Sequence, residues 1–86
     1  MDDFMFRRGR FSLPSDWLDS DFNVNAVKRI MGECFITRAE HMHHSFRIEY
    51  IACSYHFRPV ERGELSPEYE WVFNGDNLYA KEIKRG

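Results

Sequence analysis

The sequence has little of what marks most specialised classes of protein. Its 86 residues include two cysteines, three prolines and five glycines, and 12 Lys and Arg against 14 Asp and Glu give a net charge of −2. No apolar run reaches the roughly 18 residues that a membrane span needs, and acidic residues follow Met1 where an export signal would be apolar. We therefore expect a cytoplasmic protein with reduced thiols and no membrane contact. The even charge balance argues against electrostatic binding to DNA or anionic lipid.

Catalytic signatures are also missing. The glycines are scattered, so neither a Walker-type phosphate loop nor a dinucleotide fingerprint occurs. Neither Ser45 nor Ser54 lies in a nucleophile-elbow motif, and the length excludes a TIM barrel or a full dinucleotide-binding domain. We therefore predict a non-enzymatic protein without a cofactor. Because so short a domain buries little apolar surface, we also expect a homodimer or a tightly bound partner.

The chain has no linker or internal repeat, so we predict a single domain over residues 1–86. Residues 1–14 are expected to form an irregular segment or an edge strand. Phe4 and Phe6 are two residues apart there, which would place both rings on one face of a short strand.

Residues 15–32 contain the best-supported element. Apolar side chains recur at helical spacing and form one stripe, which predicts a helix. Ser15 and Ser20 are candidate N-caps. Gly32 is a candidate stop in the left-handed conformation.

Four stretches have the composition or the alternation of β-strands. Asn74-Gly75 lies between the last two and is a strong hairpin signal. Residues 39–44 are open between a short helix and a turn, because their spacing also fits a capping box. The predicted strands cover 33–38, 45–57, 68–73 and 77–84, with a loop over 58–67.

Together these elements predict an α+β fold. One N-terminal helix, over about residues 21–31, packs on an antiparallel sheet of three or four strands that ends in a C-terminal β-hairpin. The predicted core is apolar and rich in aromatic rings. Its members are Trp17, Phe22, Val27, Ile30, Phe35, Phe46, Ile48, Tyr50, Trp71, Phe73 and Leu78.

Four histidines and two cysteines are the side chains that a metal ion would use. Their spacing contains neither Cys-x-x-Cys nor His-x-x-x-His, so we predict no metal site. A small His/Cys metal-binding protein remains one alternative, with a two-histidine half-site if residues 38–44 are helical. The candidate ligands for this alternative are His41, His43, His44, Cys34 and Cys53.

Arginines and phenylalanines interleave near the N-terminus. Guanidinium groups beside stacking rings suit phosphate contacts and base stacking, so a nucleic-acid or nucleotide binder is a second alternative. If the two ends of the chain meet, these arginines join Lys81, Lys84 and Arg85 in one basic patch. The arginines are Arg7, Arg8 and Arg10.

The aromatic content points to a binding surface. Eight Phe, four Tyr and two Trp are more rings than one core of this size holds, and exposed rings favour interfaces. We therefore predict a binding protein that acts by direct contact with another protein. The predicted contact set joins the arginines to rings of the sheet: Arg7, Arg8, Arg10, Tyr55, Tyr69 and Trp71.

Four short stretches in the second half of the chain carry a resemblance to known proteins. They are Tyr50-Ile51-Ala52, Phe57-Arg58-Pro59-Val60, Gly63-Glu64 and Pro67-Glu68-Tyr69. In these stretches the chain resembles small orphan proteins encoded by bacteriophages. The resemblance implies a protein that inhibits or modulates a host or defence protein complex in the host cytoplasm, as anti-CRISPR and related counter-defence factors do. It carries over no site residues.

Overall fold

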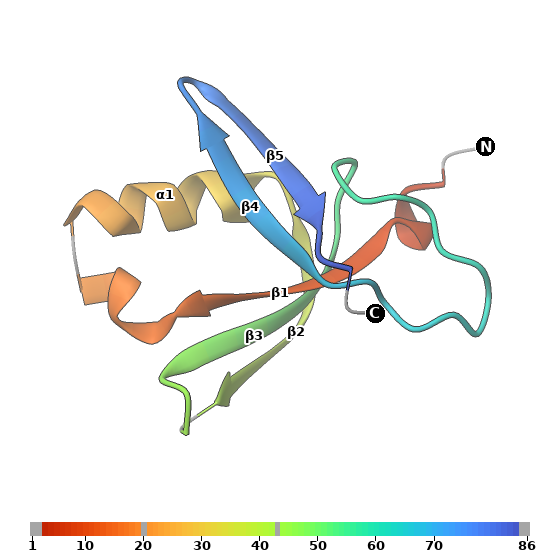
Figure 1. Ribbon diagram of the computed structural model, residues 1–86, viewed down its shortest axis with the longest axis horizontal. Helices are drawn as coiled ribbons and strands as arrows, with labels where there is room; N and C mark the ends of the chain where they lie inside the picture. The colour runs from red at the N-terminus through yellow and green to blue at the C-terminus, as the bar shows by residue number, and fades with distance from the viewer. Residues whose placement is uncertain (1–2, 20, 43, 85–86) are drawn as a thin grey trace.

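The computed structural model describes residues 3–19, 21–42 and 44–84, which form one α-helix, two short 3₁₀ helices and five strands (Figure 1). The elements are η1 (Phe4–Phe6), β1 (Arg8–Pro14), η2 (Ser15–Asp19), α1 (Asp21–Gly32), β2 (Phe35–Met42), β3 (Arg47–Cys53), β4 (Tyr69–Asn74) and β5 (Asn77–Glu82). None of the described helices is long and apolar enough to cross a membrane.

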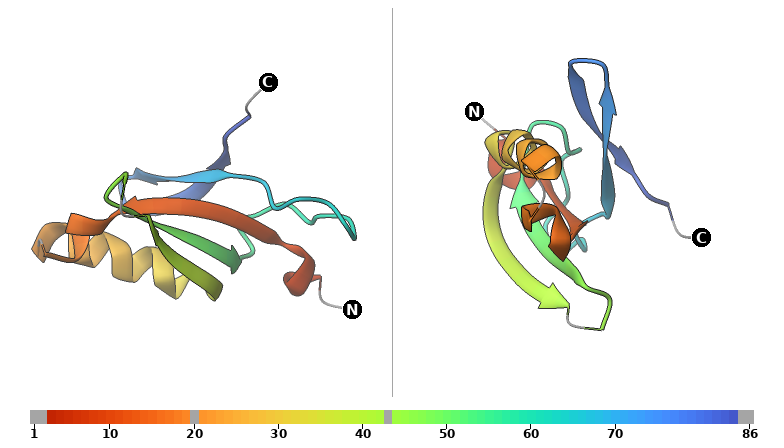
Figure 2. Two further views of the ribbon diagram at one scale, coloured as in Figure 1. Left: turned by 90° about the horizontal axis from the view of Figure 1, so that it is seen from below. Right: turned by 90° about the vertical axis from the view of Figure 1, so that its left-hand side faces the viewer.

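The strands form two separate antiparallel sheets. The first has three strands in the order β1-β3-β2, and the second is the β4-β5 hairpin. The prediction of an α+β fold with a C-terminal hairpin is therefore confirmed, whereas its single sheet of three or four strands is wrong. Figure 2 shows α1 between the curved β2-β3 pair and the hairpin, which stands away from the body.

The sequence predicts either an irregular segment or an edge strand at the N-terminus, and the structure has the edge strand, β1. In β1 the side chains alternate, so that Gly9, Phe11 and Leu13 are buried. Phe4 and Phe6 lie in η1 rather than in a strand, because the segment turns and the Arg7 N–H donates to the Phe4 carbonyl at 3.0 Å.

The predicted helix is divided between η2 and α1. Ser15 does not act as its cap, because both its N–H and its hydroxyl donate to the Phe46 carbonyl, each at 2.8 Å. Ser20, the other predicted cap, lies outside the described residues. Gly32 ends α1 without a left-handed conformation, since Gly63 and Gly75 are the glycines with positive φ in the described part of the chain.

The strands differ from the prediction mainly around the first turn of the sheet. Residues 39–42 continue β2, so the helical alternative for this stretch is wrong, and the turn occupies 44–46 instead. The next strand, β3, is shorter than the predicted 45–57. The hairpin at the C-terminus is confirmed, with Asn74 paired to Asn77 and Gly75 at φ 62°.

The core lies where α1, β1 and the first half of β4 meet. Val27 and Ile30 are buried as predicted. Other predicted members are partly buried against this core: Trp17, Tyr50, Trp71 and Leu78. The core also contains buried residues that the sequence did not assign to the core, namely Phe11, Leu13, Ala52, Phe57 and Tyr69.

Three predicted core residues are exposed instead. Phe35 is 57% exposed, because its pairing with Cys53 places it on the face of the sheet away from α1. Phe46 is 75% exposed in the turn before β3, and Phe73 is 38% exposed near the hairpin tip. Ile48 is half-buried. The side chain of Phe22, the remaining predicted member, lies outside the described residues.

One backbone bridge between described residues joins the two sheets. Arg10 and Glu68 form a parallel bridge, in which the Arg10 N–H donates to the Pro67 carbonyl at 2.9 Å. Beneath this bridge the rings of Phe57 and Tyr69 stack, with centroids 4.3 Å apart, against the backbone of Gly9. Beyond the bridge β4 diverges from β1, and this divergence creates the site described next.

Candidate binding surface

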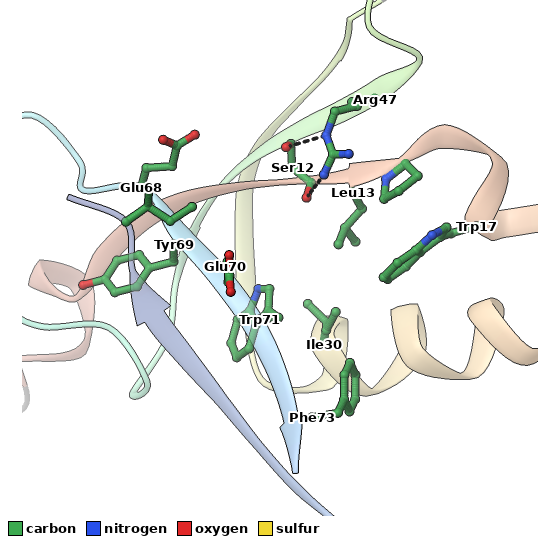
Figure 3. A pocket seen from close by; sticks show the side chains of 12 residues that line it. Ser12, Leu13, Trp17, Ile30, Arg47, Glu68, Tyr69, Glu70, Trp71 and Phe73 are labelled. Carbon is green, nitrogen blue, oxygen red and sulfur yellow. Dashed lines mark hydrogen bonds between the residues drawn. The ribbon is translucent and has the colours of Figure 1, made fainter. Parts of the chain in front are cut away.

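Two adjoining hollows lie between the hairpin and the rest of the molecule, and together they are called the wedge. The first has a volume of about 560 Å³ and lies between β1, the end of α1 and β4 (Figure 3). The second, of about 690 Å³, lies between α1 and the hairpin tip. Trp17 and Phe73 line both hollows, so the wedge is continuous past these two rings.

The floor of the wedge is apolar because three different elements turn large side chains toward it. Trp17 comes from η2 and Ile30 from α1. Trp71 and Phe73 are two residues apart and therefore lie on the same face of β4 (Figure 3). The Trp71 ring packs edge-to-face against the Phe11 ring, with centroids 5.7 Å apart, which holds Trp71 in place. A site of this kind presents rigid rings at little cost in conformational entropy.

Charged groups form the rim of the first hollow. The Arg47 guanidinium donates to the Ser12 hydroxyl at 2.9 Å and to the Ser12 carbonyl at 3.0 Å, which fixes it on the β1 side (Figure 3). Glu68 and Glu70 line the β4 side of the same hollow. The rim therefore offers positive charge on one side and negative charge on the other.

The hairpin tip is tied to the helix across the second hollow. Arg29 donates to the Asp76 carbonyl at 2.7 Å, and its guanidinium carbon lies 5.6 Å from the centre of the Phe73 ring. Lys28 lines the same hollow. This tether holds the two sides of the wedge at a fixed separation.

One polar atom of the wall has no hydrogen bond in the described part of the structure. The indole N–H of Trp71 is buried without a partner. A buried donor left in this state costs about 1–3 kcal/mol, so the fold keeps Trp71 in place despite this cost.

The three predicted arginines occupy different environments. Arg7 is bound within the chain, to Asp3 at 2.9 Å and to the Phe57 carbonyl at 2.9 Å, and its hydrogen bond lowers the pKa of Asp3. Arg8 is half-buried, and its Nε has no partner in the described chain. Arg10 is exposed. Arg7 therefore holds η1 against the 54–60 segment, and the role of the three arginines as contacts stays a prediction.

The predicted basic patch exists only in part. Arg10 and Lys84 line a common hollow of about 340 Å³, so the two ends of the chain do approach each other there. Glu68 and Glu82 line the same hollow and reduce its positive charge. Arg85 lies outside the described residues.

The three predicted aromatic contacts also separate. Trp71 lines the wedge. Tyr55 is 63% exposed and packs on the Phe4 ring, with centroids 4.8 Å apart, and it lines neither hollow of the wedge. Tyr69 is only 4% exposed, and its hydroxyl accepts a hydrogen bond from the Arg58 N–H at 3.0 Å. Tyr69 is therefore mostly enclosed in the core, although it also lines the first hollow, and its role as a contact stays a prediction.

The candidate metal ligands are spread over the fold. His41 lies on β2 and His44 in the following turn, so the helical half-site proposed for them is wrong. His43 lies outside the described residues. Cys34 is half-buried, and Cys53 is buried with its thiol directed at the Met5 carbonyl, 3.8 Å away. No group of three or more such ligands comes together among residues 3–19, 21–42 and 44–84.

A different histidine has a carboxylate partner. The His56 Nε2 lies 3.1 Å from the Glu33 Oε2, and its ring meets the edge of Trp71. Cys34 is the neighbouring nucleophile, but burial raises the pKa of its thiol to about 12, and a hydrogen bond with Ser54 offsets only part of that rise. Because the thiolate is the reactive form, this group does not resemble an activated cysteine site.

Comparison with known proteins gives no relative. No family model, no curated protein and no solved structure matches the chain. The wedge must therefore be interpreted from its own residues. Of these, the sequence singled out Tyr69 and Trp71 as contacts and Trp17 and Phe73 only as core, whereas Arg47 was missed because a single arginine in a strand carries no recognisable signal.

Proposed function

We propose that this chain is a small non-enzymatic binding protein that holds a segment of another protein in the wedge. The observation that carries the proposal is the row of partly exposed rings, Trp17, Trp71 and Phe73, between α1 and the hairpin. A single small core does not need these rings to stay open to solvent. Clustered aromatic side chains in a partly enclosed hollow are typical of the residues that dominate binding energy at protein interfaces.

The shape and charge of the wedge suggest the kind of segment that fits. Two adjoining hollows of about 560 and 690 Å³ suit two large apolar side chains of the partner. Arg47 on one side and Glu70 on the other favour a segment with polar or charged residues flanking these side chains. Arg10 and Tyr55 are exposed outside the wedge and remain in the predicted contact set.

The resemblance to phage-encoded orphan proteins suggests the identity of the partner. On that resemblance the partner is a component of a host or defence complex in the bacterial cytoplasm, and binding would inhibit or modulate it. The alternative of a nucleic-acid or nucleotide binder has weaker support, because Arg7 is bound to Asp3 and Phe57. The metal-binding alternative has no cluster of ligands among the described residues on which to build.

The test compares two aromatic substitutions on opposite faces of one hairpin. Phe73→Ala removes a ring from both hollows, whereas Tyr79→Ala removes a ring of similar exposure, 44% against 38%, from β5 outside the wedge. Both variants and the wild type are immobilised, exposed to a bacterial lysate, and compared by quantitative mass spectrometry. We expect proteins that the wild type and Tyr79→Ala retain and that Phe73→Ala retains at least about tenfold less well.

Circular dichroism of each variant provides the folding control. If both variants retain the same proteins in the same amounts as the wild type, the wedge is not the binding surface and the proposal is wrong.

A further inference from the structure

The strand β2 forms an open edge of the three-stranded sheet. Among the described residues it pairs with β3 alone, in the order β1-β3-β2, and it lies at the margin of the sheet (Figure 2). Every residue of β2 except Ile36 is exposed. An exposed edge of this length is a template for pairing with another strand, and proteins usually protect such edges.

The hydrogen-bonding pattern shows which backbone groups face outward. In β1 the Arg10 N–H points away from β3, to the Pro67 carbonyl, so Arg10 and Ile51 form a non-hydrogen-bonded pair. The Ile51 carbonyl must then point toward β2, where the Thr37 hydroxyl donates to it at 3.0 Å. Because bonded and non-bonded pairs alternate, the N–H and C=O of Ala39, opposite Tyr50, face away from the sheet.

Pro14 agrees with this alternation. It lies in β1 at a position of the same parity as Arg10, where the ladder with β3 needs no N–H. Proline is tolerated in a strand only at such positions.

The charges around Ala39 are self-complementary. Arg38 and Glu40 flank it on one face of β2, where they form an ion pair within one copy, with the Arg38 Nη2 3.7 Å from the Glu40 Oε2 and side chains that are 69% and 60% exposed. If two copies of β2 paired antiparallel about Ala39, Arg38 of each copy would lie directly opposite Glu40 of the other. Opposite charges at such positions stabilise a sheet, and like charges destabilise it.

Within one copy, the same face carries an unfavourable pair. Glu40 lies directly opposite Glu49 of β3. These two residues line a small hollow of about 100 Å³ with Arg38 and Ile51. A second guanidinium at the edge of this hollow would offset the repulsion between the two carboxylates.

We propose that two copies of this chain associate through β2, paired antiparallel about Ala39, to form a continuous six-stranded sheet. The partner surface is a second copy rather than another protein, because the order Arg38-Ala39-Glu40 complements itself. This pairing is independent of the wedge, because none of the residues that line the wedge belongs to β2.

The experiment exchanges the charges singly and together. Arg38→Glu makes both flanking residues acidic, and Glu40→Arg makes both basic, so each variant opposes like charges in its own dimer. Sedimentation equilibrium of the intact chain should show a wild-type dimer and a dimer dissociation constant at least about tenfold higher for either variant. The double variant, Arg38→Glu with Glu40→Arg, should dimerise like the wild type.

Mixing the two single variants gives the sharpest readout. One is isotopically labelled, and native mass spectrometry should show the mixed dimer in excess over both homodimers, because acidic and basic edges then face each other. Arg62→Glu, an exposed reversal in the 58–67 loop, should leave the dimer unchanged. A wild-type chain that stays monomeric at every concentration would overturn the proposal, and so would a dimer that neither charge reversal weakens.

Discussion

A methyl group added at Gly9 would test how the two sheets are joined. A Cβ atom at this position would lie 2.6 Å from Cδ2 and Cε2 of the Tyr69 ring and 2.9 Å from Cδ2 of Phe57. Neither ring can retreat easily, because they stack on each other at 4.3 Å and are only 4% and 1% exposed. We therefore expect Gly9→Ala to force the rings and the backbone of β1 apart.

Two effects of opposite sign set the magnitude. Alanine is better than glycine in a strand by about 0.5–1 kcal/mol, because glycine loses more conformational freedom on folding. Overpacking a buried contact costs about 1–3 kcal/mol. The clash is larger, so the free energy of unfolding should fall by about 1–2 kcal/mol. In a domain of this size that corresponds to a melting temperature lower by about 4–16 °C.

Urea unfolding followed by tryptophan fluorescence measures this difference. Gly32→Ala is the matched control, because nothing lies within 4 Å of a Cβ there and its φ is not positive. This control should leave stability unchanged or raise it by up to about 1 kcal/mol. The double variant Gly9→Ala with Tyr69→Leu should lose less than the sum of the single losses, because the smaller side chain relieves the clash.

A Gly9→Ala protein as stable as the wild type would refute this reasoning. It would mean that β1 and the Phe57–Tyr69 stack are not in contact, and hence that the hairpin is attached to the body in another way.

Three further predictions concern the surface and the thiols. A hydrogen bond from Arg58 lowers the pKa of Glu64. The stability that this pair contributes is therefore present above the ordinary carboxyl pKa, and it is lost as the pH falls through the lowered pKa of Glu64. Arg58→Gln should raise the pKa of Glu64 in an NMR titration. In the variant Cys53→Ala, Cys34 is the single thiol. A thiol reagent should modify Cys34 slowly in the folded protein and fast in the urea-unfolded protein, because burial raises the pKa of this thiol to about 12. Equal rates in the two states would contradict this. Phe46 has φ 54°, so Phe46→Asn should raise the free energy of unfolding by about 1 kcal/mol, and an unchanged urea midpoint would count against strain at this turn.

Local patterns predicted the local elements of this fold. The apolar stripe that ends at Met31 predicted α1, and Asn74-Gly75 predicted the hairpin, because both signals depend on neighbours in sequence. The order β1-β3-β2 could not be predicted in the same way, because it depends on which distant strands meet. The bulge between Ile36 and Arg38 likewise has no signature in the sequence.

The site shows the same division between local and distant information. Tyr69 and Trp71 have the same alternation on β4, so the sequence treats them alike. They differ because Tyr69, the first residue of β4, directly follows the bridge between Arg10 and Glu68. Trp71 lies two residues further along, where β4 has diverged from β1. Phe57 was assigned to the end of a strand before a loop, yet it becomes one of the most buried rings because the 54–60 segment returns along η1.

The central place of β3 has a consequence for how the chain is made. On the ribosome β1 emerges early, but the strand that pairs with it ends at Cys53, and the rings that cover Gly9 come from Phe57 and Tyr69, later still. The amino-terminal half therefore leaves the exit tunnel with Phe11 unprotected. Folding of this domain must wait until Tyr69 has been synthesised, and a stalled or truncated chain that stops before Tyr69 would be a substrate for chaperones or proteases rather than a smaller stable domain.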